Sequence, residues 1–170
     1  MIGDVAVCLL TEAAAAWAST GRPVPPSARV YVGSAPYDDC CDPGLLMVTV
    51  DALAWFNPFP VEQGGQVTGI GAGSPMPRPC FGSLGAYTTV HIGLCVPVVD
   101  ERGVPPSPAA ESRALLDVLD LAEVIATRLA CDSDCWTIGP TAFLGPEGGC
   151  FAAQISLRVD GTCDPCPGTL

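Results

Sequence analysis

The spacing of apolar and polar positions predicts a helix at the start of the chain. Between Asp4 and Thr20 apolar residues recur at helical spacing, and the alanine run Ala13–Ala16 adds helix propensity. Gly21, followed by Pro23, is typical of residues just beyond a helix C-terminus. We therefore expect an N-terminal helix with one apolar side.

A second, longer helix is predicted from Pro108 to about Ala130. Ser107 suits the N-cap position, and proline is favoured at the first helical position. The apolar positions of this segment form one stripe: Leu115, Leu119, Ala122, Ile125, Ala126 and Leu129. Charged residues occupy the opposite side, so we expect the apolar stripe to face the core.

Five segments predict β-strands. They are Arg29 to Gly33, Leu45 to Phe56, Thr88 to Val98, Trp136 to Leu144 and Phe151 to Asp160. In the third segment, Val90, Ile92 and Leu94 alternate with Thr89 and His91, which predicts a buried face and a wetter face. The second segment is apolar at nearly every position, as expected for a central strand.

The order of these elements predicts an α+β fold. We expect an antiparallel sheet of about four strands, with the N-terminal helix and the second long helix packed on one face. Residues 1–170 should form a single domain that has a long loop at 57–82 and a short Cys/Pro-rich tail at 161–170. Loops as long as 57–82 are often functional, so this loop is a candidate contact region.

Charge and hydropathy narrow the function classes. The net charge is −11 and the chain has no lysine, which argues against nucleic-acid binding because phosphate contacts need clustered cations. The N-terminus lacks the basic segment of a secretion signal, and no window has 18–20 consecutive apolar residues. We therefore expect folding in a cytoplasm and no membrane contact.

Ten cysteines are the chain's most unusual compositional feature. The candidate disulfide cysteines are Cys40, Cys41, Cys80, Cys95, Cys131, Cys135, Cys150, Cys163 and Cys166. Their spacings do not make two matched pairs of zinc ligands, so disulfides or small buried thiols are favoured over a metal site. Spacing alone selects no connectivity.

The residue pattern does not assemble a catalytic site. His91 is the only histidine, and it lies about 13 Å along its strand from Cys95, too far for a dyad. The glycines from Gly69 to Gly73 do not have the spacing of a dinucleotide-binding loop. We expect a protein that is not an enzyme, with no catalytic residues and no cofactor.

Several stretches, in order, resemble the tail terminator proteins of long-tailed, siphovirus-type bacteriophages that infect actinobacteria. They are Asp39–Val50, Cys95–Pro97, Gly103–Ala110 at the start of the long helix, Cys131–Cys135, and Pro146–Cys150. The resemblance implies a structural virion protein, usually a homohexameric ring, that caps the head-proximal end of the tail tube. Such a ring ends tube polymerisation and joins the tail to the head-side connector.

The resemblance also implies partners and a location. The partners are further copies of the chain, the major tail tube protein and the head-side stopper or connector protein, while genomic DNA passes through the lumen without specific binding. The location is the tail–neck junction of the virion, after assembly in the host cytoplasm. We expect several cysteines to be disulfide-bonded in mature particles.

A ring needs two different contact patches on each copy. Candidate interface residues are Thr89 and His91, on the wetter strand face, and Phe59 in the long loop. The alternatives are another phage neck protein, such as a stopper or head–tail adaptor, and a small disulfide-stapled binding module.

Overall fold

The computed structural model describes residues 1–33, 44–56, 83–95, 104–131, 135–147 and 149–161. These residues contain two helices and five strands. In chain order they are α1 (Ile2–Ser19), β1 (Arg29–Val32), β2 (Leu45–Phe56), β3 (Ser83–Cys95), α2 (Pro108–Cys131), β4 (Trp136–Glu147) and β5 (Cys150–Asp160). Residues 57–82, predicted as a long loop, and residues 162–170 of the predicted tail lie outside the described residues.

The strands form one mixed sheet with the order β1-β2-β3-β5-β4. All neighbouring pairs are antiparallel except β1 and β2, which run parallel. The predicted α+β class is confirmed, but the sheet has five strands instead of about four and is not purely antiparallel. A parallel pair needs a connection of about a dozen residues, and the chain between Val32 and Leu45 has that length.

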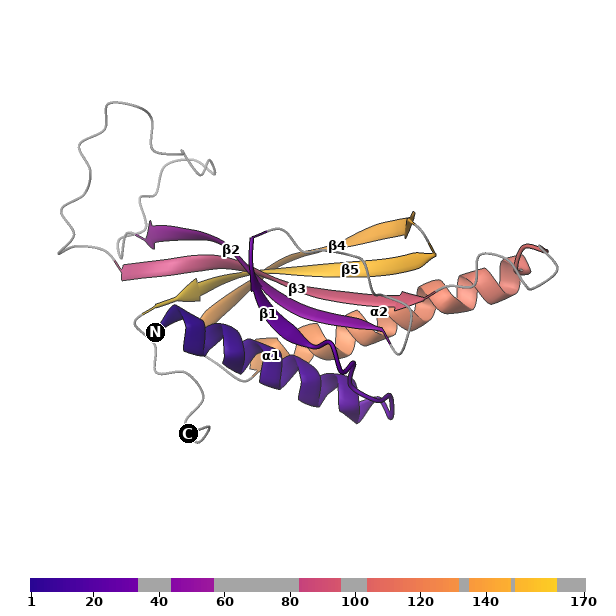
Figure 1. Cartoon of the computed structure of the whole chain (residues 1–170), viewed down its shortest axis with the longest axis horizontal. Coiled ribbons are helices and arrows are strands. Elements are labelled where there is room, and N and C mark those ends of the chain that lie inside the picture. The colour runs from indigo at the N-terminus through magenta and orange to yellow at the C-terminus, as the bar shows by residue number, and fades with distance from the viewer. Residues whose placement is uncertain (34–43, 57–82, 96–103, 132–134, 148, 162–170) are drawn as a thin grey trace, which may run out of the picture.

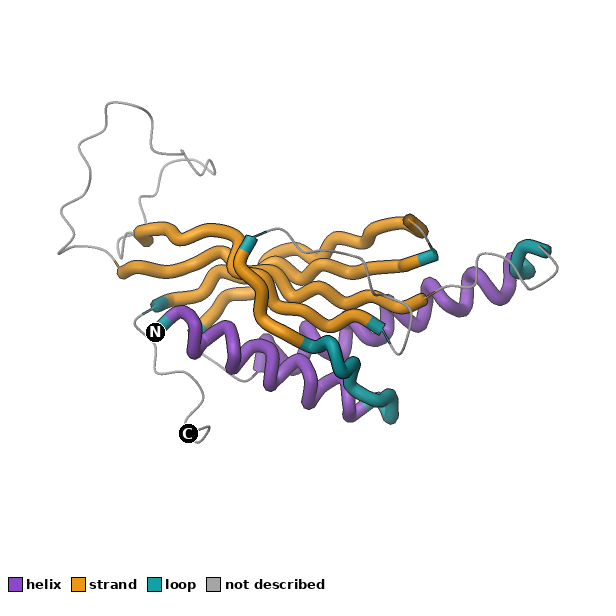
Figure 2. The backbone as a smooth tube through the Cα atoms, viewed as in Figure 1, coloured by secondary structure: helices purple, strands orange, loops and turns teal. Residues whose placement is uncertain are grey.

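Both helices cover the same face of the sheet, as predicted (Figure 1). The helix α1 packs mainly on β2 and β3, and α2 packs mainly on β5 and β3 (Figure 2). Alternate residues of the central strand β3 point into this layer, so Val90, Ile92 and Leu94 join the helix residues in one core. No helix of the described residues lies on the opposite face of the sheet.

The apolar composition of α1 reflects its place in the core. By length and composition alone α1 could span a membrane, a criterion that a buried core helix also meets. Its buried residues are Val5, Ala6, Cys8, Leu9, Ala13, Ala16 and Trp17. The Trp17 Nε1 donates a hydrogen bond to the Pro23 carbonyl oxygen at 3.0 Å, which fixes the turn after the helix.

The predicted cap of α2 is present, because the Ala110 N–H donates to the Ser107 hydroxyl at 3.2 Å. At the other end, the Trp136 Nε1 donates to the Leu129 carbonyl oxygen at 2.8 Å and satisfies one of the carbonyls left open in the last turn. Strand β4 is thereby anchored to the C-terminal end of α2.

Candidate interaction surfaces

A group of polar side chains lies on the helix-free face of the sheet, across β2 and β3. The carboxylate of Asp51 accepts two short hydrogen bonds, from the Thr49 hydroxyl to Oδ1 and from the Thr89 hydroxyl to Oδ2, both at 2.6 Å. The His91 Nε2 lies 2.9 Å from the Thr49 hydroxyl. The sheet register brings these residues together, because Thr49 lies opposite Thr89 and Met47 opposite His91.

The number of hydroxyl hydrogens in this group determines which atoms donate and which accept. A hydroxyl has one hydrogen, and the short contact to Asp51 uses that of Thr49. In its contact with His91, the Thr49 oxygen is therefore the acceptor. The donor is the N–H group at His91 Nε2. Both threonine protons are therefore directed at a carboxylate, an arrangement that orders the sheet surface and does not activate either hydroxyl as a nucleophile.

Burial dominates the electrostatics of His91, which is only 5% exposed. Burial lowers the pKa of His91 below its usual 6.5, and the nearby Asp51 carboxylate opposes this in part. The folded protein therefore binds this proton less readily than the unfolded chain does.

A pH dependence of stability follows from this shift. The contribution of neutral His91 is fully present above about pH 6.5, and it decreases as the pH falls through that value toward the lower pKa of the folded state. Thermal melting between pH 7.5 and 5.5 should show this decrease in the wild type and a flatter profile in His91→Gln. Parallel profiles for the two proteins would contradict the assignment, because His91 is the only histidine.

Of the three predicted interface residues, the structure describes Thr89 and His91 but not Phe59. Thr89 and His91 share the helix-free face, as the alternation predicted, but His91 is buried instead of wet. Leu45 and Met47, on the same face of the sheet, are buried as well, so His91 belongs to a part of this face that is shielded from solvent. Phe59 lies outside the described residues, and the roles of all three in an interface stay predictions.

The described cysteines fall into two groups. Cys8, Cys95 and Cys150 are disulfide-bonded, and Cys95 lies directly opposite Cys150 in the β3–β5 ladder. Cys131 and Cys135 are not disulfide-bonded. Cys8 was not among the predicted disulfide cysteines, because its helical spacing indicated a core position.

Cys131 and Cys135 form no disulfide in this structure, and the prediction that several of the candidate cysteines are bonded in mature particles stays a prediction. Cys131 is exposed on the last turn of α2, whereas Cys135 is buried just before β4, so the two thiols lie in different environments. The remaining candidates, Cys40, Cys41, Cys80, Cys163 and Cys166, lie outside the described residues.

The N-terminal part of α2 is a second surface with unusual properties. Figure 1 shows this end of the helix extending beyond the sheet and beyond α1. Leu115, Leu116 and Leu119 are 40%, 56% and 43% exposed. The sequence stripe had assigned Leu115 and Leu119 to the core, and that prediction is wrong because the sheet ends before the helix does.

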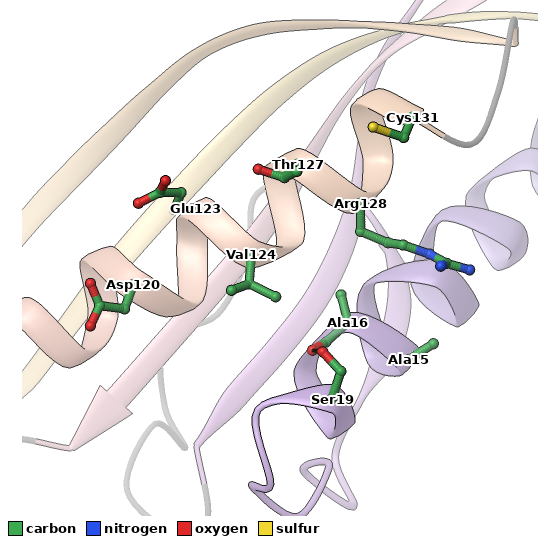
Figure 3. A pocket seen from close by; sticks show the side chains of 9 residues that line it. All are labelled: Ala15, Ala16, Ser19, Asp120, Glu123, Val124, Thr127, Arg128 and Cys131. Carbon is green, nitrogen blue, oxygen red and sulfur yellow. Dashed lines mark hydrogen bonds between the residues drawn. The ribbon is translucent and has the colours of Figure 1, made fainter.

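A groove runs between α1 and α2 on the outer side of the helical layer, with a cavity volume of about 670 Å³. It is lined by Ala15, Ala16, Ser19, Asp120, Glu123, Val124, Thr127, Arg128 and Cys131. Figure 3 shows Val124 pointing from α2 toward Ala16 and Ser19 of α1, while Arg128 crosses toward α1. Small side chains on α1 leave this groove open.

The two helices are held on either side of the groove by ion pairs. Arg128 donates to the Glu12 carboxylate from Nε at 3.1 Å and from Nη2 at 3.0 Å. Arg22 pairs with Asp117 at 3.1 Å. Both pairs are substantially exposed, so each contributes little stability, about 0–1 kcal/mol. The spacing of the helices is set mainly by their packing on each other and on the sheet.

Among the described residues, no three histidine, cysteine, aspartate or glutamate side chains are grouped as a metal site would require. No protein-family model matches the chain, and no curated protein is similar to it. The surfaces described above therefore carry the functional argument.

Proposed function

We propose that this protein is a structural virion protein that forms a ring on the head-proximal end of a phage tail tube. The ring ends tube polymerisation and joins the tail to the head-side connector. The proposal rests on the ordered sequence resemblance to tail terminators and on surfaces that suit assembly better than catalysis.

The observation that carries the proposal is the apolar end of α2. Three neighbouring leucines, Leu115, Leu116 and Leu119, are exposed where α2 extends beyond the sheet, although Val118, Leu121, Ala122, Ile125 and Leu129 of the same helix are buried. Exposed apolar patches of this kind are typical of protein–protein contact sites. Binding a protein partner would remove this apolar surface from water, which favours association.

The charge balance is compatible with a ring around DNA. The net charge of −11 and the small number of cations disfavour adhesion to phosphate, so DNA can pass without being held. Two of the arginines near the helices, Arg22 and Arg128, are already paired with carboxylates.

Native mass spectrometry of the purified protein tests the assembly. We expect a discrete closed oligomer, six times the 17.4 kDa chain mass if the ring is a hexamer, which negative-stain images show as rings. A continuous ladder of masses would indicate open polymers, and a ring of another stoichiometry would correct the copy number while leaving the proposal standing. A monomer that also fails to bind tube ends would contradict it.

A further inference from the structure

The N-terminal overhang of α2, which we define as Pro108–Leu116, carries an unpaired cation beside an exposed leucine. Arg113 is exposed and forms no ion pair with any described residue. Leu116 follows it by three positions, so both side chains lie on the same side of the helix. The overhang also carries the exposed Glu111, but this residue is two positions from Arg113 and so lies on another side of the helix. The side shared by Arg113 and Leu116 therefore presents one apolar and one cationic contact together.

The groove between α1 and α2 has the complementary chemistry. Ala15, Ala16 and Val124 give it an apolar floor, and the exposed carboxylates of Asp120 and Glu123 line one side. Arg128 cannot neutralise them fully, because its guanidinium is held by Glu12. Within the described residues neither carboxylate has an ion-pair partner.

The overhang cannot reach the groove of its own chain. Of the two groove carboxylates, Asp120 lies seven positions and about 10 Å along the axis from Arg113, and Glu123 lies ten positions and about 15 Å away, on one continuous helix. The nearer carboxylate, Asp117, is already paired with Arg22. A contact between these complementary surfaces must therefore come from another copy.

We infer that the overhang of one copy docks in the α1–α2 groove of the next, with Leu116 on Ala16 and Val124, and Arg113 beside Asp120 and Glu123. The inference deepens the proposed ring and rests on it for the closed symmetry. The two patches differ, so the contact is heterologous, and heterologous contacts that close generate rings. Charge complementarity selects a second copy as the occupant, because the overhang's cation and the groove's carboxylates belong to the same chain.

Sedimentation velocity over a concentration series, at about 0.15 M salt, tests this contact in the full-length protein. We expect the wild type to associate, and Arg113→Glu, Leu116→Asp and the double variant Asp120→Arg/Glu123→Arg each to weaken association about tenfold or more. A mixture of Arg113→Glu with the double variant should regain association, because each overhang then meets a groove of opposite charge.

Two matched controls separate the contact from general effects. Val7→Asp changes an apolar residue of α1 that is as exposed as Leu116, at 56%. Arg29→Glu changes the net charge by the same amount as Arg113→Glu and affects another exposed arginine without an ion pair to any described residue. Both controls should associate like the wild type, and circular dichroism should show that every variant is folded.

The contact and the proposed function fail in different ways. Association that is unchanged by Arg113→Glu and Leu116→Asp, or a wild type that stays monomeric at every concentration, would overturn the docking contact. A protein that associates through this contact but leaves tube ends bare would support the contact and contradict the terminator function. Loss of association in the controls as well would also overturn the specific contact.

Discussion

Replacing Gly44 with alanine is expected to lower the free energy of unfolding by about 2–5 kcal/mol, because two independent penalties add. Gly44 has a φ of +139°, a conformation that residues with a Cβ rarely adopt. An added Cβ would lie 2.9 Å from the Gly93 carbonyl oxygen and 2.9 Å from the Trp17 ring. The substitution would thus strain the start of β2 exactly where α1 packs on the sheet.

Chemical denaturation of three variants separates the two penalties. Gly21→Ala is the matched control, since Gly21 has a φ of +79° but nothing within 4 Å of the added Cβ, and it should lose only about 1–2 kcal/mol. Combining Gly44→Ala with Trp17→Ala should cost less than the sum of the two, because the ring contact disappears while the Gly93 contact remains. A Gly44→Ala loss no larger than that of Gly21→Ala would contradict the close approach.

The local patterns in the sequence predict the elements well. Ser107 and Pro108 mark the start of α2, and the structure has the cap at that place. The alternation around Val90 and Ile92 correctly assigns one face of β3 to the core. These signals depend on neighbouring residues alone, so they can be read without knowing the fold.

Whether a side chain of the candidate surfaces is exposed or buried depends on elements that are distant in the sequence. Leu115 and Leu119 match the buried stripe of α2, and only the end of the sheet makes them exposed. The alternation predicts a wet face for His91, but the side chain is buried, a property that depends on the rest of the fold and not on its own strand. Asp51 was missed as the acceptor of two threonine hydroxyls, although its alternation with Thr49 could have indicated a polar pair on one strand face.

Capping should have a large effect on tube assembly. If the ring binds the growing end of a tail tube, it blocks the surface on which the next tube subunits add, so growth at that end stops. We therefore expect tubes polymerised with this protein to be shorter, with one end closed by a ring. Arg113→Glu should cap less well, whereas Arg29→Glu should cap like the wild type.

The most direct test is electron microscopy of the phage's major tail tube protein, polymerised with and without this protein. The account predicts an added ring at one end of each tube and a tube-length distribution that shortens as the ring concentration rises. Tubes of unchanged length with two bare ends would contradict it.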